Sequence, residues 1–360
     1  MDTISPSVGQ IGVTKMRMFL SSLKLISVRS VHTLLFLKDI CVAKLSMRYS
    51  PNSHKHLLSA FYLTGGFIHK VAAKLLGDTR IEFPKDGLLS KFTKAEILDA
   101  SDHLKREGYV VLEGVLSPQL CAKILAVSEQ IPGQSRIMDG GTGVARKMNF
   151  NRQNPPSIRF DYEGSDLISN QVLQTLIFDE SILDFAQSYL GAAPVLDLVT
   201  MWWHTTFSSI PDKEAAQWFH FDMDRLKWIK FFFYITDVDS NSGPHTFIAK
   251  SHRSLGIPYK LRSKGYARLT DQEVLSNFKS VDFKEFVGKG GTLIVEDTRG
   301  LHKGKHCISG DRLLFQLEFT TSKFGTPIPE LVINPPLDQE SKSFEIFNKY
   351  PTVYQSIKNL

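Results

Sequence analysis

Residues 228–238 read WIKFFFYITDV, a run that alternates between two kinds of side chain. Successive residues of a strand point to opposite faces, so Ile229, Phe231 and Phe233 would share one fully apolar face. The opposite face would mix aromatic, polar and charged side chains. Residues 312–321, RLLFQLEFTT, alternate in the same way. We expect the apolar faces to pack on helices and the mixed faces to line a common cavity, solvent exposure of the mixed faces being the alternative.

Further strands are expected on both sides of this run. They are bounded by turn residues such as Asn241-Ser242-Gly243-Pro244 and cover residues 195–205, 217–222 and 292–296. Many short strands separated by Gly, Pro and Asn are typical of a sandwich, jelly roll or barrel. No Gly-rich phosphate loop precedes a helix, so nucleotide-binding folds lack support.

Helices are expected before the strands. Thr93 and Glu96 form the pattern of a capping box, and the helix that they open would end at Gly108, before a buried strand over 109–112. Ser117-Pro118 starts a second helix, and a third spans 180–190. Residues 133–165 are rich in Gly, Asn, Arg and Pro, which predicts a long irregular loop of the kind that often forms a lid or binding loop.

The charge of the chain is concentrated at its N-terminal end. The 360 residues contain 43 Lys and Arg against 37 Asp and Glu, a net charge of +6. Residues 1–60 hold eight basic and two acidic residues, so the other 300 are neutral. This argues against a broad nucleic-acid-binding surface on the main domain. Three widely spaced cysteines without a CxxC pair argue against a disulfide framework and for a reducing compartment.

The basic N-terminal segment leaves three interpretations open. No apolar run there is long enough to span a membrane, and Lys15 and Arg17 interrupt any signal-peptide core. The segment is a helical extension with solvated charges, an acid-poor transit peptide, or a basic helix that contacts an anionic membrane through residues 10–50. The expected location is cytoplasmic, or mitochondrial for a transit peptide. We expect an N-terminal extension over 1–90, a main domain over 91–325 and a C-terminal tail over 326–360. Deletion of residues 1–60 should then leave the main domain intact.

A metal site is indicated by His220-Phe221-Asp222. Residues i and i+2 of a strand share a face, so the imidazole and the carboxylate can reach one ion. His302, just after the strand over 292–296, would supply a third ligand. Two histidines and one carboxylate form the facial triad of non-haem Fe(II) oxygenases. The alternatives are a core histidine at 220, a strand-end residue at 222, and His306 as the third ligand.

An arginine that could bind a carboxylate follows the predicted metal ligands in the sequence. Arg312 lies ten positions after His302, at the start of the next strand. A buried guanidinium there can bind the distal carboxylate of a dicarboxylic acid through two hydrogen bonds. Other histidines are expected to be structural: His204 and His245 as packed residues, and His54 and His56 as solvated ones.

These parts occur in a familiar order. The chain resembles the phytanoyl-CoA dioxygenase family of Fe(II)/2-oxoglutarate oxygenases over roughly residues 100–322. The stretches that carry the resemblance are residues 108–118, 220–222, 241–253, 297–302 and Arg312. The resemblance implies an α+β fold with a mainly β core, a double-stranded β-helix (jelly roll, cupin-like) flanked by helices.

The resemblance also implies roles for individual residues. His220, Asp222 and His302 would bind iron, Arg312 would hold the C5 carboxylate of 2-oxoglutarate, and Trp228 would line the cosubstrate pocket. Two further positions match the pocket more loosely, Met201 and Arg159.

The chain departs from the family at Phe221, where many members have Gln. Asp222 is retained, whereas related halogenases have a small residue there, so the chain resembles a hydroxylase. The implied activity is oxidation of a C–H bond of a small organic molecule with Fe(II), 2-oxoglutarate and O2, giving succinate and CO2. The alternatives are a non-catalytic jelly-roll scaffold recruited by its basic N-terminal segment, and a cupin-like metalloenzyme that does not use 2-oxoglutarate.

Overall fold

The computed structural model describes residues 8–46, 48–137, 146–265 and 267–360. Its helices are α1 (Val8–Ser46), α2 (Ser53–Thr64), α3 (Phe67–Leu76), α4 (Lys94–Glu107), α5 (Pro118–Gln130), α6 (Gly164–Ile168), α7 (Gln171–Ile177), α8 (Glu180–Leu190), α9 (Tyr259–Arg262), α10 (Asp271–Leu275) and α11 (Lys342–Lys349). Its strands are β1 (Tyr109–Leu112), β2 (Gly133–Ser135), β3 (Lys147–Met148), β4 (Arg159–Tyr162), β5 (Val195–His204), β6 (Trp228–Tyr234), β7 (His245–Ile248), β8 (Phe283–Phe286), β9 (Leu293–Glu296), β10 (His302–Gly304), β11 (Arg312–Thr320), β12 (Leu331–Ile333) and β13 (Ile357–Asn359).

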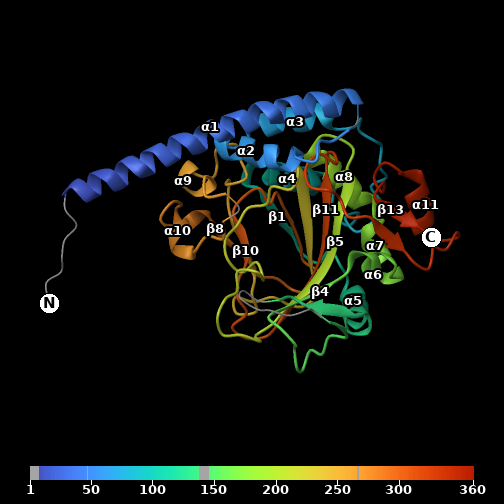
Figure 1. Cartoon of the computed structure of the whole chain (residues 1–360). Helices are drawn as coiled ribbons and strands as arrows, with labels where there is room; N and C mark the ends of the chain where they lie inside the picture. Colours follow the sequence, from blue (N-terminus) through green and yellow to red (C-terminus); the bar gives the residue numbers. More distant parts are fainter. Residues whose placement is uncertain (1–7, 47, 138–145, 266) are drawn as a thin grey trace.

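Two antiparallel sheets form the centre of the molecule (Figure 1). The larger runs in the order β1-β9-β6-β11-β5-β4-β2-β3 and does not close into a barrel, and the smaller runs β10-β7-β8. Side chains from both sheets meet in one apolar cluster that includes Phe232, Phe247 and Leu314. This is the cupin-like, jelly-roll arrangement that we expected, with helices around it.

The apolar faces of β6 and β11 pack on helices, as predicted. Ile229, Phe231 and Phe233 are completely buried in a cluster that also takes in α5, α7 and α8. The ring of Phe231 lies edge-on to Phe185 of α8, with 6.2 Å between the ring centroids. β11 pairs with β6 so that Phe315 lies opposite Phe233. The strict alternation in the sequence therefore separates a helix-covered face from a face turned towards the smaller sheet.

The expected helix ends are confirmed. The Thr93 hydroxyl accepts from the backbone N–H of Glu96, whose carboxylate accepts from the backbone N–H of Thr93 at 2.7 Å, a complete capping box. Gly108 ends α4 with φ of 92°, in the left-handed region that glycine tolerates. Ser117 caps α5 and Pro118 is its first residue.

Two expectations about loops and strands were wrong in part. Within residues 133–165, β2 and β4 join the large sheet, because the backbone of β4 pairs with the edge of β5 beside Trp203. Residues 138–145 of that stretch lie outside the described residues. Residues 217–222 do not form a regular strand. They form isolated bridges instead, Phe219 with Leu269 and His220 with His302.

The N-terminal segment contributes to the core, which corrects the expectation that residues 1–60 form a removable extension. Phe36 of α1 is completely buried in a cluster with residues of α2, α3 and the segment 219–228. Phe61 of α2 lies 5.5 Å, centroid to centroid, from Phe221, the residue between the two predicted ligands. His56, expected to be solvated, is buried with its Nδ1 2.7 Å from a carboxylate oxygen of Asp39. In the described ranges, no helix combines the length and the apolar character that crossing a membrane requires.

The C-terminal tail is an ordered part of the same body. β12 and β13 pair in parallel, and α11 lies between them in the sequence. Val353 is completely buried, and its carbonyl accepts from the backbone N–H of Leu196 in β5 at 2.8 Å. Residues 326–360 therefore cover one end of the large sheet.

Candidate metal centre

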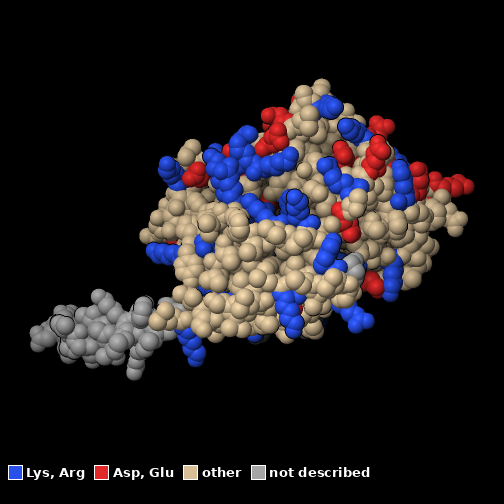
Figure 2. All heavy atoms as spheres, turned by 90° about the horizontal axis from the view of Figure 1, so that it is seen from above, with Lys and Arg blue, Asp and Glu red and all other residues tan. Residues whose placement is uncertain are grey.

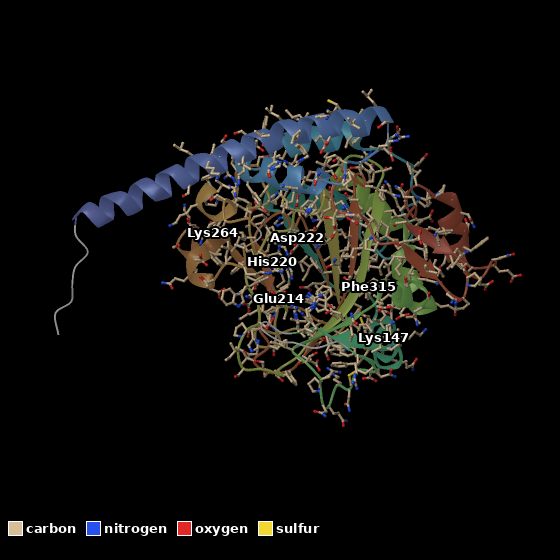
Figure 3. All side chains as sticks on the ribbon, viewed as in Figure 1. Lys147, Glu214, His220, Asp222, Lys264 and Phe315 are labelled. Atoms are coloured by element: carbon tan, nitrogen blue, oxygen red, sulfur yellow. The ribbon has the colours of Figure 1, made fainter. Side chains whose placement is uncertain are left out.

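His220, Asp222 and His302 come together in the interior of the molecule, although they lie on two separate segments. The backbones of His220 and His302 exchange two hydrogen bonds of 3.0 and 2.9 Å, which fixes the two segments side by side. One ligand atom from each of the three residues lies within 4.8 Å of the others. Figure 3 shows His220 and Asp222 close together near the middle of the molecule. The structure therefore assembles the group that the sequence predicted.

Both imidazoles are oriented by backbone carbonyls. Nδ1 of His220 donates to the carbonyl of Trp218 at 2.9 Å, and Nδ1 of His302 donates to the carbonyl of Gly300 at 3.0 Å. With the proton on Nδ1, each Nε2 carries a free lone pair. Nε2 of His220 lies 4.0 Å from one oxygen of Asp222, and Nε2 of His302 lies 3.6 Å from the other. Such carbonyl contacts are the usual way in which proteins fix the tautomer of a metal-binding histidine.

The electrostatics keep all three groups in the form that binds a metal. Burial lowers the pKa of both His220 and His302, so both are neutral at physiological pH. Burial acts to raise the pKa of Asp222, but Lys230 and the two imidazoles outweigh it, and the pKa lies well below its ordinary value. Nζ of Lys230 donates to a carboxylate oxygen of Asp222 at 2.7 Å. The carboxylate is therefore ionised and held in place.

The triad lies in the wall of a cavity of about 340 Å³. The mixed faces of β6 and β11 supply part of its lining, as predicted from their alternation, through Lys230, Phe232, Arg312 and Gln316. The loop 216–222, β7 and β10 supply the opposite wall. The cavity thus lies between the two sheets, and both the predicted ligands and the predicted arginine line it.

Arg312 lines the same cavity and is only 1% exposed. It donates through Nη1 to the carbonyl of Gly243 and through Nη2 to Nδ1 of His204, the latter at 2.5 Å. Its Nε has no hydrogen-bond partner among the described residues. His204, expected to be a packed strand residue, therefore lines the cavity and holds the guanidinium.

The residues present fit a divalent metal ion and a dicarboxylic acid. Two neutral imidazoles and one ionised carboxylate, gathered on one side of a cavity, form a facial donor set for iron(II). The buried N–H of Arg312 without a partner, on a guanidinium that keeps its charge, fits a carboxylate. Gly304 leaves room beside it, since a Cβ there would lie 2.9 Å from Nη2 of Arg312.

The residues that matched the family pocket divide into two groups. Arg159 lines the cavity, whereas Met201 points into the helix-covered core. Trp228 is completely buried in the N-terminal cluster, and its indole N–H donates to Thr298 at 2.8 Å. It shares a strand face with Lys230, but the described lining of the cavity does not include it. His306, the rival ligand, is turned towards Gln217 instead, 3.3 Å from its side-chain oxygen.

Sequence reasoning missed the pair formed by His245 and Glu296. Nε2 of His245 lies 2.8 Å from the Glu296 carboxyl group, and its ring stacks on His302 with 5.6 Å between centroids. Burial raises the pKa of Glu296 to about 8, so this carboxyl is mostly protonated at neutral pH. The available signal was an acid at the end of the otherwise apolar strand over 292–296.

One comparison with known proteins identifies a family. The family model for phytanoyl-CoA dioxygenase (PhyH) matches residues 104–311, more than half of the chain. A search of the curated proteins found no match.

Several solved structures are similar. HygX from Streptomyces hygroscopicus with nickel and 2-oxoglutarate is 14% identical, with a TM-score of 0.46 over 69% of this chain and 93% of that one. The epimerase SnoN in complex with Fe3+, alpha ketoglutarate and nogalamycin RO is 14% identical, with a TM-score of 0.44 over 63% and 84%. EvdO2 from Micromonospora carbonacea var. aurantiaca is 12% identical, with a TM-score of 0.44 over 62% and 90%.

Proposed function

The chain belongs to the phytanoyl-CoA dioxygenase family, and we propose that this 2-oxoglutarate-dependent non-haem iron enzyme hydroxylates a C–H bond of a small organic molecule. The observation that carries the proposal is the triad of His220, Asp222 and His302 in the same cavity as Arg312. Each of the four side chains is buried, and the two histidines are neutral while Asp222 is ionised.

The residues divide the work between binding the metal and binding the cosubstrate. His220, Asp222 and His302 would hold Fe(II), and Arg312 would bind the C5 carboxylate of 2-oxoglutarate through its Nε–H, which has no partner among the described residues. Fe(II) and 2-oxoglutarate, when bound, supply the activation of O2 that oxidises the substrate, with succinate and CO2 as coproducts. Lys230 keeps Asp222 ionised, and the carbonyls behind both histidines keep their Nε2 atoms available.

The walls of the cavity support a small substrate. Phe232 and Trp202 form an apolar part of the lining, and Arg136 and Arg159 form a charged part. Both arginines are paired with Asp161, at 2.9 and 2.8 Å, so a single carboxylate compensates part of their combined charge. A cavity of about 340 Å³ that also holds 2-oxoglutarate leaves room for the reacting end of a substrate of modest size.

The first test is the formation of succinate from 2-oxoglutarate by protein loaded with Fe(II). His220→Ala should abolish it, because the variant removes one of the ligands that the cavity brings together. His306→Ala is the matched control, since this histidine lies outside the described lining of the cavity. Equal activity of wild type and His220→Ala would show that the triad is not the reactive centre. A metabolite screen for products that gain one oxygen atom would then identify the substrate.

A further inference from the structure

A second, larger hollow opens on another face of the molecule (Figure 2). Its volume is about 1020 Å³, and it lies between α3, the C-terminal ends of α4 and α8, and residues 252–254. Its described lining contains one carboxylate, from Asp78, and seven cationic side chains, from Lys70, Lys74, Arg80, Lys105, Lys227, Arg253 and Arg299. In Figure 2, Lys and Arg side chains gather around the hollow.

Part of this positive charge is uncompensated. At the bottom, Lys227 donates to the carbonyls of Tyr189 and Leu190 at 2.6 and 2.9 Å, and Arg299 is paired with Asp297. Lys70, Lys74 and Arg80, in contrast, form no ion pair with any residue that the structure describes. The hollow therefore presents several cations that have no ion-pair partner among the described residues.

The crowding of these cations affects their protonation. Burial and the nearby Arg299 lower the pKa of Lys227 to about 8, and the same two causes lower the pKa of Lys70. A bound anion would relieve both the repulsion and the cost of burial. Geometry and charge thus agree that the hollow suits a ligand with several negative oxygens, such as a phosphate group.

The helix that carries Lys70 and Lys74 also exposes an apolar stripe. Phe67, Val71 and Leu75 of α3 follow each other at intervals of four residues, and Phe67 is 66% exposed. A row of large exposed apolar side chains on one helix face is typical of a site that contacts a protein or a membrane. The stripe borders the hollow, because Lys70 and Lys74 of the same helix line the hollow.

Helix α1 extends this apolar surface. Phe36 and Ile40 point into the core, while Leu34 and Leu45 on the outer side are 68% and 87% exposed. Other exposed residues of α1 are also apolar or cationic, namely Val31, Leu37, Lys38, Val42 and Lys44. In Figure 2, α1 and the hollow are seen on the same face. We call the exposed residues 23–45 of α1, the stripe of α3 and the hollow the docking face.

We propose that the docking face binds the surface of an anionic lipid bilayer. The exposed apolar side chains of α1 and α3 enter the interface between headgroups and acyl chains, and the hollow receives the phosphate of an anionic headgroup. Lysines beside the apolar stripe keep their ammonium groups among the headgroups, as amphipathic interfacial helices do. The basic excess of residues 1–60 adds to the cations of the hollow, all of which come from residues 70–299.

Charge complementarity favours a bilayer over the other occupants. A second copy of the same face would set seven cations of one hollow near seven of the other, which repels. A free phosphate compound would fill the hollow but would leave Leu34, Leu45 and Phe67 in water. An anionic bilayer satisfies both the charge and the apolar surface.

Docking in this orientation leaves the catalytic end accessible. β4, whose Arg159 lines the metal cavity, lies at the end of the molecule opposite α1 (Figure 1). The proposal does not depend on the reaction at the metal centre.

The test is flotation of the full chain with vesicles of phosphatidylcholine alone and of a four-to-one mixture with phosphatidylserine. Wild type should bind the mixed vesicles and not the neutral ones. The double variant Lys70→Ser, Lys74→Ser should lower binding on the order of tenfold, because each cation near the surface contributes severalfold. Leu34→Ser with Leu45→Ser should lower it comparably.

The matched control removes the same charge elsewhere. Lys123 on α5 and Lys289 in the turn before β9 are exposed and lie outside the docking face, so Lys123→Ser with Lys289→Ser should bind like wild type. The proposal would be overturned if this control lost as much vesicle binding as the Lys70 and Lys74 variant. It would also be overturned if wild type bound neutral vesicles as well as it binds the mixed ones.

The competing occupants give distinct results. If wild type binds pyrophosphate, and the variant of Lys70 and Lys74 loses that binding while its vesicle binding is unchanged, the ligand of the hollow is a soluble phosphate compound. This result would overturn the proposal. If wild type sediments as a dimer and the variant with Leu34→Ser and Leu45→Ser sediments as a monomer, the docking face binds a second copy of the chain. This result would also overturn the proposal. Thermal melting of every variant separates loss of binding from loss of folding.

Discussion

Single hydrogen bonds decide the chemistry of the cavity. The two Nδ1–H groups that donate to backbone carbonyls leave Nε2 of His220 and His302 available to a metal, and Lys230 keeps Asp222 ionised. None of these three contacts could be read from the sequence, because they depend on the local backbone conformation and on where β6 lies after folding. The candidate ligands could be chosen from the sequence, since the spacing of His220 and Asp222 places both on one side of an extended segment.

The position of Trp228 in the structure shows what strand alternation cannot predict for a single residue. Alternation placed it on the cavity face of β6, together with Lys230 and Phe232. In the structure the N-terminal helices cover that end of the face, and Trp228 is buried among them. A periodic pattern predicts the direction of a side chain but not what lies above it.

The Glu296→Gln variant should change how stability depends on pH. Burial raises the pKa of Glu296 from 4.5 to about 8, so the folded state keeps a proton that the unfolded state loses at lower pH. This group therefore contributes stability at acid pH that is lost as the pH rises from about 4.5 to about 8. Gln does not titrate. Relative to wild type, the variant should gain on the order of 5 kcal/mol across this window.

Denaturant unfolding of both proteins at several pH values in the presence of EDTA measures that difference. The titration of His245 is common to both proteins and largely cancels. A difference between variant and wild type that does not change with pH would show that Glu296 is ionised throughout.

The Gly304→Ala variant tests the predicted carboxylate site. A methyl group at 304 would lie 2.9 Å from Nη2 of Arg312 and 3.0 Å from Cε1 of His204, so it narrows the space beside the guanidinium. We expect KM for 2-oxoglutarate to rise about tenfold, the cost of disturbing one charge-assisted contact. Metal affinity, measured by titration with Mn(II), should stay unchanged, because residue 304 is not part of the triad. Unchanged KM would place the cosubstrate elsewhere.

At the scale of elements, the regular strands were the predictable part. β5, β6, β9 and β11 lie within one or a few residues of their expected bounds, since each alternates strongly or forms a buried apolar run. Residues 217–222 also carry a strand pattern, but they pair only at isolated positions. Their conformation depends on contacts with β10 and on α2, which lie far away in the sequence.

The N-terminal helices illustrate the opposite case. α1 has charged residues on several sides, so its sequence did not predict which face would be buried. Phe36, Ile40 and Ala43 form that face, because they meet α2 and the ligand-bearing segment. The segment expected as an extension is therefore structural support for the metal centre.

Phe36→Ala should destabilise the fold by about 3–5 kcal/mol, the usual cost of truncating a buried aromatic side chain. The ring is completely buried and lies edge-on to Phe324, 5.8 Å away. Leu34→Ala on the same helix is the control and should cost less than about 0.5 kcal/mol, since Leu34 is exposed. Urea unfolding measures both. A small effect at Phe36 would mean that α1 is separable from the core after all.

At the scale of the whole molecule, two functions occupy two different places. The metal centre lies between the sheets, in a part of the chain whose net charge is zero. The excess positive charge belongs to the N-terminal helices and contributes to the docking face. The charge count from the sequence therefore bears on where the protein docks and not on the charge of its substrate.

The central claim is that metal and cosubstrate share the cavity between His302 and Arg312. Its most direct test is an anaerobic titration of 2-oxoglutarate into protein with and without Fe(II), for wild type and Arg312→Leu. Wild type should bind 2-oxoglutarate tightly only when Fe(II) is present, and Arg312→Leu should bind Fe(II) normally but 2-oxoglutarate at least tenfold more weakly. Equal binding of 2-oxoglutarate with and without Fe(II), or by both proteins, would contradict the account.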